Sequence, residues 1–309
     1  VNFANKDGQT TSIAFRSSRS RERNLQFYYN PDYINRITIQ SSGIDTLPVT
    51  KLNSLSYLNL RYNNLKNFPN LISIAPNLTS LLLSRNPFYL SETASERKLT
   101  SVIIDKIPAG LTRLDLPGSF YGSIDPNLFS KFTNITEFNL GRGGGAYFHP
   151  DGVHANTPLP NIHDTCTTYT AYNNDFRTIA SSSGDNKNIK ELPNLSYLHL
   201  SGNYYLSDGS FTTLTSPDIN YINLAATNLP IPNLAGKTQL QNAYMHYMRS
   251  NGGLFSGNTY KFNNCTALET LYLYATRVGG QFPRFTNPSL KYLEMRYTNV
   301  VGGYKDGST

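Results

Sequence analysis

The fold is decided by the stretch LSYLNLRYNNL at residues 55–65, in which leucine recurs at positions 55, 58, 60 and 65. The alternation of apolar and polar residues around Leu58 and Leu60 is typical of a short strand that turns both leucines inward. The pattern returns as LTSLLLSRNPF at residues 78–88 and as LSYLHLSGN at residues 195–203. Strands repeated in one phase predict a parallel sheet built from successive turns of a coil.

Eleven copies of this pattern can be aligned along the chain. They start at Ile34, Leu55, Leu78, Leu111, Ile135, Cys166, Leu195, Ile219, Leu240, Leu268 and Leu290. Successive starts lie 21 to 33 residues apart, a period that is typical of a solenoid. The longer steps predict insertions near residues 89–110, 141–165, 173–192 and 247–265.

The pattern L-x-x-L-x-L-x-x-N-x-L resembles the leucine-rich-repeat family over roughly residues 34–300. The resemblance implies an α/β-type solenoid of about eleven turns, with one parallel β-sheet on the inner curve and mostly irregular or short-helical returns. Residues 1–33 are expected to form an N-terminal flanking segment and residues 34–309 the solenoid. Because open ends of a solenoid expose apolar core and no cap is recognisable, we expect a piece of a longer polypeptide or a mature product.

A polar position follows the strand in most copies and predicts a ladder inside the coil. Asparagine occupies it at Asn63, Asn86, Asn174 and Asn203. Ser42, Ser119, Thr227, Thr276 and Thr298 take the same place elsewhere. A buried polar side chain must hydrogen-bond, here to backbone groups of the turn. The ladder is expected to be weakest at Gly143 and Met248, which cannot make these bonds.

The composition excludes several classes of protein. Charged residues make up only 15%, which favours strands and loops over surface helices, and the net charge of +7 is spread too diffusely to indicate nucleic-acid binding. The sequence contains no run of 18 apolar residues, so no membrane span is predicted. Low charge with abundant Tyr, Asn, Ser and Gly also resembles, more weakly, the tail-fibre and baseplate proteins of tailed phages.

The two cysteines are expected to be buried structural thiols. Cys166 and Cys265 fall about four turns apart, which is ~19 Å at ~4.8 Å per strand and beyond the ~7 Å reach of a disulfide. No cysteine-rich cap is visible, so we expect synthesis in a reducing cytoplasm. Four N-x-S/T sequons, at Asn77, Asn134, Asn194 and Asn264, leave a secreted eukaryotic protein open.

The outward strand positions predict a binding face. Early turns carry mixed polar residues, whereas later turns are rich in tyrosine. The predicted face comprises Tyr197, His199, Tyr221, Tyr244, His246, Tyr247, Tyr272, Tyr274, Tyr292 and Tyr297. Tyrosine offers a flat ring and a polar tip at low entropic cost, which suits protein interfaces and sugar rings. The alternative is that tyrosine merely fits exposed strands.

Other constellations point less clearly to a site. The insertion at 141–165 holds His149, His154 and His163 with Asp151 and Asp164, which are metal-ligand types. A surface loop that contacts a neighbouring subunit, or nothing, is favoured, and no metal or cofactor is expected. Gly141 opens a glycine-rich run that lacks the lysine of a phosphate loop. Arg16, Arg19, Arg21 and Arg23 are interpreted as a solvated face.

A search for catalytic motifs finds neither H-E-x-x-H nor G-x-S-x-G. Asp115 and Glu137 are expected at neighbouring outward positions, ~4.8 Å apart, as a glycosidase pair would require. Two carboxylates beside Arg113 are more often a charge feature, so no enzyme is predicted.

These observations favour a non-enzymatic interaction or structural module exposed on a phage virion or bacterial surface. Its expected partners are protein subunits of a larger assembly, or a cell-surface protein or glycan, with no nucleic acid and no membrane insertion. The first alternative is an extracellular receptor-like ectodomain of a eukaryote, and the second is a glycan-cleaving spike.

Overall fold

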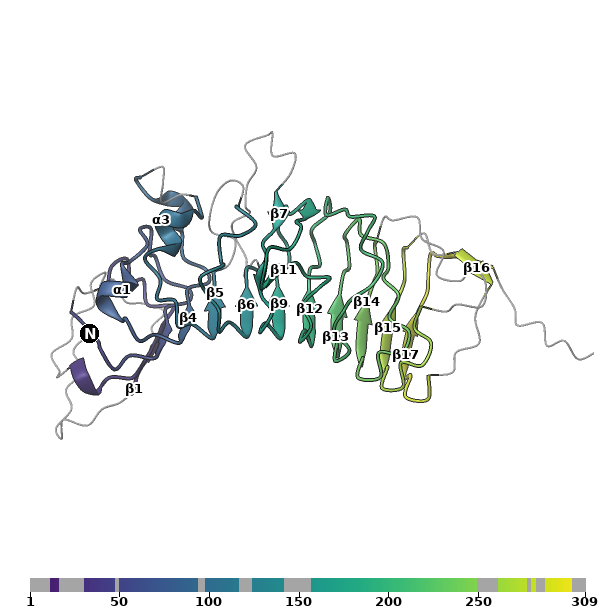
Figure 1. Ribbon diagram of the computed structural model, residues 1–309, viewed down its shortest axis with the longest axis horizontal. Helices are drawn as coiled ribbons and strands as arrows, with labels where there is room; N and C mark the ends of the chain where they lie inside the picture. Colours follow the sequence, from purple (N-terminus) through teal and green to yellow (C-terminus); the bar gives the residue numbers. More distant parts are fainter. Residues whose placement is uncertain are drawn as a thin grey trace, which may run out of the picture.

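The computed structural model describes residues 12–16, 31–47, 50–93, 98–116, 124–141, 157–248, 261–276, 279–281 and 287–301. These residues form an elongated coil in which the strands run side by side on the inner side of a shallow arch, while the return segments occupy the opposite side (Figure 1). The leucine-rich-repeat solenoid and its parallel sheet on the inner curve are thereby confirmed.

The sheet has twelve parallel strands, and eleven of them coincide with the predicted repeats. Their bounds are β1 Ser12–Arg16, β2 Arg36–Gln40, β3 Tyr57–Asn59, β4 Ser80–Leu82, β5 Arg113–Asp115, β6 Glu137–Asn139, β9 Thr168–Thr170, β12 Tyr197–His199, β13 Tyr221–Asn223, β14 Asn242–Tyr244, β15 Thr270–Tyr272 and β17 Tyr292–Glu294. The twelfth, β1, pairs with β2 from within the segment expected to be flanking. Its sequence SIAFR lacks the leucine pattern, so the repeat search missed it.

The described parts of the returns are mostly irregular. They contain the helices α1 Leu71–Ile74 and α3 Ser101–Ile104 and the 3-10 turns η1 Pro31–Tyr33 and η2 Phe88–Leu90. Small strand pairs join β7 Pro158–Leu159 to β10 Thr178–Ile179, β8 Ile162–His163 to β11 Asn186–Lys187, and β16 Gly279–Gln281 to β18 Asn299–Val301. The predicted residues Arg19, Arg21, Arg23, Ser119, Gly143, His149, Asp151 and His154 lie outside the described part of the chain.

The core follows from the alternation within each strand. In each three-residue strand of the main sheet from β3 to β15 the middle residue, such as Leu58, Leu114 or Leu198, points inward and is almost fully buried, and in β2 the inward residues are Ile37 and Ile39. Residues on either side point to the opposite face, which gives β12, β13 and β14 the same half-buried–buried–half-buried order. Because the register is constant from strand to strand, outward residues of successive turns fall into columns across the sheet.

Where a polar residue is described at the position after a strand, it forms the expected contacts inside the coil. The Nδ2 of Asn86 donates to the carbonyls of Leu60 (2.9 Å) and Leu83 (2.8 Å), and its Oδ1 accepts from the N–H of Leu65 (3.1 Å). Asn63, Asn174 and Asn203 likewise donate to carbonyls of their own turn and of the preceding one. Thr227 makes one short bond instead, to the carbonyl of Leu224 (2.8 Å). The asparagines therefore tie adjacent turns together, whereas Thr227 bonds mainly within its own turn.

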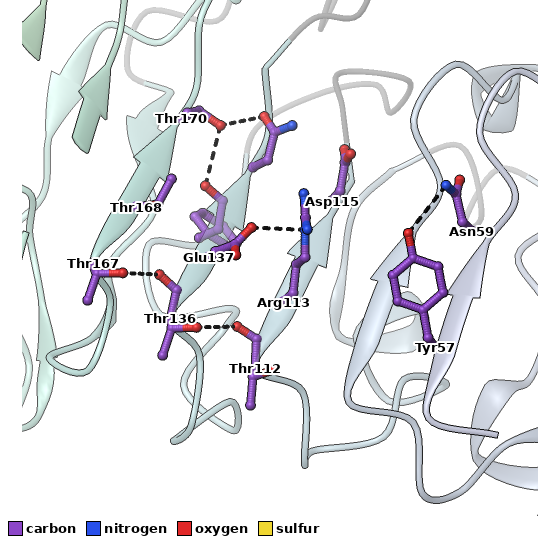
Figure 2. A network of polar contacts seen from close by, with 12 residues as sticks. Tyr57, Asn59, Thr112, Arg113, Asp115, Thr136, Glu137, Thr167, Thr168 and Thr170 are labelled. Carbon is purple, nitrogen blue, oxygen red and sulfur yellow. Dashed lines mark hydrogen bonds and ion pairs between the residues drawn. The ribbon is translucent and has the colours of Figure 1, made fainter. Parts of the chain in front are cut away.

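A second ladder, not anticipated from the sequence, precedes the strands. The hydroxyl of Thr136 donates to the carbonyl of Thr112 (3.1 Å), and that of Thr167 donates to the carbonyl of Thr136 (3.1 Å; Figure 2). Equivalent bonds are made by Thr79, Thr112 and Ser196. These bonds add a side-chain link between turns on the solvent side of the sheet.

The residue just before the ladder position repeatedly adopts a left-handed conformation. Tyr62 (φ 60°), Ala226 (φ 56°) and Tyr247 (φ 55°) show it, and so do Ala275 and Tyr297. This region is unfavourable for residues with a Cβ atom. The coil therefore stores a small strain at the end of most of the strands whose following turn is described, which is where the chain turns away from the exposed face.

Candidate functional site

The exposed face of the sheet carries three outward positions per strand, and its character changes along the solenoid. From β9 to β15 the fifteen outward positions hold no charged side chain. We call this surface the neutral aromatic face: Thr168, Thr170, Tyr172, Tyr197, His199, Ser201, Tyr221, Asn223, Ala225, Asn242, Tyr244, His246, Thr270, Tyr272 and Tyr274.

Aromatic rings on this face touch one another in an oblique row. Tyr197 and Tyr221 stack nearly in parallel (6°) with centroids 4.2 Å apart, and Tyr221 lies 5.6 Å from Tyr244. Tyr244 packs edge-on against Tyr272 at 5.2 Å, and Tyr272 leads on to Tyr274 at 6.3 Å. The row thus begins at the first outward position of the early strands and ends at the third outward position of the later ones.

Both ends of the row are extended by further rings. At the far end His246 stacks on Tyr274 at 4.7 Å and Tyr247 packs against the same ring at 5.2 Å. At the near end His199 contacts Tyr197 at 6.5 Å. Eight of the ten predicted binding-face residues are therefore brought together by the fold.

The sequence analysis missed one member of the row, Tyr172. Its ring stacks on His199 at 4.6 Å. It also lies over the backbone of Gly141, where a Cβ atom would come within 2.2 Å of the Tyr172 ring. The signal was present, because Tyr172 stands two residues before the ladder residue Asn174, just as Tyr274 stands two residues before Thr276. Including Tyr172, nine described rings form one continuous contact network.

Tyr292 and Tyr297 lie apart from this row. Tyr292 pairs in register with Thr270, and the column from Tyr221 to Tyr292 passes through Asn242 and Thr270, neither of which is aromatic. Tyr292 is 61% exposed and Tyr297 is 83% exposed. Their membership of a binding face stays a prediction.

The two histidines of the face are held neutral by burial. Burial lowers the pKa of His199 to about 4, and it also lowers the pKa of His246, against a weaker opposing effect of Glu294. The Nε2 of His199 lies 2.7 Å from the Ser201 hydroxyl and 3.3 Å from the Asn223 amide nitrogen. Burial likewise raises the pKa of Tyr197. The face therefore carries no charge near neutral pH.

Charged residues lie on the N-terminal side of the face, and each carboxylate there is paired. Arg113 Nε lies 2.9 Å from Glu137 Oε2 (Figure 2). Asp115 contacts Arg61. Burial raises the pKa of Asp115, although Arg61 opposes that effect. Two further arginines lie over rings: Arg36 over Tyr57 and Arg85 over Tyr62.

The expected placement of Asp115 beside Glu137 is wrong. The register sets Glu137 opposite Arg113 and sets Asp115 opposite Asn139. The two carboxylates therefore occupy different columns, and Glu137 is engaged by the arginine of the neighbouring strand. The repeat phase already contains this difference, because Arg113 and Glu137 each stand two residues after a repeat start whereas Asp115 stands four residues after Leu111.

The remaining candidates do not converge on a site. Among the described residues, no three His, Cys, Asp or Glu side chains lie close enough to hold a metal ion. His163 adjoins Asp164 at 3.2 Å, and its predicted companions His149 and His154 lie outside that part. Cys166 and Cys265 are buried free thiols, as expected, and burial raises the pKa of Cys166 to about 12 and that of Cys265 to about 11.

Comparison with known proteins gives the fold. No model of a known protein family matches the chain. No curated protein sequence matches it either. Solved structures do match it. The plant peptide hormone receptor RGFR1 in complex with RGF2 has a TM-score of 0.57 and 16% sequence identity, and the match covers 94% of this chain and 48% of the receptor chain. A TDR receptor has a TM-score of 0.58 and 18% identity, and the match covers 85% of this chain and 43% of that receptor chain.

A bacterial structure is similar to a comparable degree. The functional domain of InlJ from Listeria monocytogenes has a TM-score of 0.52 and 16% identity over 93% of this chain and 63% of its own. The chain has a leucine-rich-repeat fold. It spans about half the length of the solved structures that it resembles.

The part of the chain that the structure describes includes no helix long and apolar enough to cross a membrane.

Proposed function

We propose that this chain is a non-enzymatic binding module that holds its ligand on the neutral aromatic face. The observation that carries the proposal is the unbroken row of nine rings on the solvent side of a rigid sheet. Aromatic side chains bury much area at low entropic cost, and tyrosines are enriched where proteins bind partners. Ring-to-ring contacts fix the row before a ligand arrives, which reduces the ordering cost of binding.

The charged half of the sheet supports a binding role over a catalytic one. A glycan-cleaving spike needs two carboxylates facing one substrate, one of them free to act as an acid. Here Glu137 is paired with Arg113, and Asp115 is buried against Arg61. The neighbouring placement of Asp115 and Glu137, which suggested glycan cleavage, is therefore not found in the structure.

The proposal includes exposure on the surface of a phage virion or a bacterial cell, with subunits of a larger assembly, or a cell-surface protein or glycan, as partner. The low charge and the buried thiols support synthesis in a reducing cytoplasm. The alternative is a receptor-like ectodomain of a eukaryote. The intact mass of the native protein separates the two, since mass removable by an N-glycosidase would favour the ectodomain.

The binding proposal is tested by selecting ligands without assuming their class. A displayed random-peptide library and a glycan array are both applied to the wild-type chain and to a Tyr244→Ala/Tyr272→Ala variant. We expect the selected ligands to compete with one another and to lose at least tenfold in affinity for the variant. Ligands that bind both proteins equally would locate recognition elsewhere and refute the proposal.

A further inference from the structure

The neutral aromatic face has sharp electrostatic boundaries. The Arg113–Glu137 ion pair borders it on the N-terminal side. On the C-terminal side Glu294 pairs with Arg296, and Lys291 lies 2.9 Å from Glu269. Between these borders none of the fifteen outward positions carries a charged side chain that could pair directly with a charge on a ligand. A charged group buried without a counter-charge loses far more hydration energy than it regains, so the contacting part of the ligand must be uncharged.

The polar groups on the face can both donate and accept hydrogen bonds. They are phenol and aliphatic hydroxyls, the primary amides of Asn223 and Asn242, and the neutral imidazoles of His199 and His246. Each of these groups offers a donor and an acceptor, unlike an ammonium or a carboxylate. A ligand complements such a surface when the polar groups along its whole length can also both donate and accept hydrogen bonds.

The orientation of the rings adds to this match. Tyr197 and Tyr221 stand on adjacent strands with nearly parallel planes 4.2 Å between centroids, close to the ~4.8 Å strand spacing. Their planes therefore face along the solenoid, so each ring is turned edge-on to solvent. The pair presents ring edges and hydroxyl tips rather than a flat ring face.

The size of the face limits the ligand further. Five strands cover about 19 Å along the solenoid, and three outward positions cover about 13 Å along each strand. The flat footprint between the outermost residues is roughly 250 Å², which is a smaller patch than the one that gives ~800 Å² of buried accessible surface on each partner of a stable protein complex. A globular protein would extend onto the charged borders, whereas a narrow chain fits within the face.

We propose that the neutral aromatic face binds an uncharged oligosaccharide. This inference rests on the proposed function and names its ligand class. Every sugar hydroxyl both donates and accepts, as do the groups of the face, whereas a peptide N–H only donates and a peptide carbonyl only accepts. The face also offers no charged group for a peptide terminus. The phenol tips of the stacked Tyr197–Tyr221 pair offer hydrogen-bond partners to sugar hydroxyls.

The test is a glycan array of neutral oligosaccharides of glucose, galactose, mannose and N-acetylglucosamine, with polygalacturonate and sulfated glycans as charged counterparts. Bound sugars are then titrated calorimetrically against the wild-type chain and three variants. Tyr244→Ala removes a central ring and Tyr244→Phe removes only its hydroxyl. Tyr204→Ala is the matched control, because Tyr204 is 54% exposed and lies outside the face.

We expect a neutral oligosaccharide to bind, with affinity reduced at least tenfold by Tyr244→Ala, less by Tyr244→Phe, and less than twofold by Tyr204→Ala. Since screening acts only on charges, affinity should change less than twofold between about 50 mM and about 500 mM NaCl. Binding confined to charged glycans, equal binding by Tyr244→Ala, or binding of no neutral sugar overturns the assignment.

The outcomes also separate this inference from the proposed function. If peptides selected on the wild-type chain lose affinity for the Tyr244→Ala variant while no neutral sugar binds, the face is a peptide site: the sugar assignment fails and the binding module stands. If neither peptides nor sugars respond to Tyr244→Ala, both proposals fail.

Discussion

Asn203 offers the sharpest test of what holds the solenoid together beneath the neutral aromatic face. It is fully buried, and its Nδ2 donates to the carbonyls of Ala171 (2.8 Å) and Leu200 (2.7 Å), while its Oδ1 accepts from the N–H of Phe176 (3.3 Å). Asn203→Ala removes three hydrogen bonds and leaves their backbone partners in the core. At ~1 kcal/mol for each lost bond, we expect the free energy of unfolding to fall by about 3 kcal/mol.

Thr227 supplies the matched control in the same ladder. Its Oγ1 donates to the carbonyl of Leu224 (2.8 Å) and accepts only a long bond from the N–H of Leu229 (3.5 Å). Thr227→Val keeps the shape and removes the hydroxyl, so it should cost only about 1 kcal/mol. Both variants are measured by urea unfolding followed by circular dichroism, and amide exchange at Phe176 should accelerate in Asn203→Ala alone. Equal losses in the two variants, or a loss below about 1 kcal/mol in Asn203→Ala, would refute the reasoning.

Three further outcomes follow from the same structure. Ala226→Gly should raise the free energy of unfolding by about 0.5 kcal/mol, because the free energy gained by relieving the left-handed strain exceeds the entropic stabilisation of the unfolded chain by glycine. The control Ala235→Gly has no such strain to relieve and should lower the free energy of unfolding in the same urea titration. The pKa of His199 falls from 6.5 to about 4 on folding, so below pH 6.5 the unfolded chain takes up a proton that the folded chain does not. The free energy of unfolding should therefore be highest above pH 6.5 and should decline by roughly 2 kcal/mol as the pH falls towards 4, after allowance for partial solvation. A His199→Gln variant that keeps the same decline would contradict this explanation. Cys166 should resist a thiol reagent in the folded chain, since burial raises its pKa to about 12, and should react on unfolding in urea; rapid labelling without denaturant would show that the turn opens.

The repeat pattern predicted the strands because the physics behind it is local. An inward leucine at every second position and a polar residue after the strand can be read wherever they occur, as in the copies at Leu55 and Leu195. The strand β1 was missed because its sequence SIAFR carries no leucine and its place is fixed by pairing with β2. Tyr172 was missed because its turn is longer and less regular, although its offset from Asn174 marked it as outward.

The contacts between turns could not be predicted in the same way. Asp115 and Glu137 are both outward, yet the register pairs Glu137 with Arg113 and sends Asp115 towards Arg61, two turns away. Similarly, the repeat phase places the tyrosines in columns, but only the structure shows that the Tyr221 ring reaches Tyr244 in the next column and that the row crosses the sheet obliquely. These contacts join residues that are remote in the chain, and their partners depend on how adjacent turns are aligned.

The sequence by itself determined the solenoid, the inward and outward sides of each strand, the buried thiols and the richness of the later turns in tyrosine. All of these depend on residue type and on a period within one turn. The tertiary structure alone decided which rings touch, which carboxylates are neutralised and where the uncharged part of the face begins and ends. Those properties arise between turns, where insertions of different length precede each strand and the backbone hydrogen bonds of the parallel sheet set the alignment.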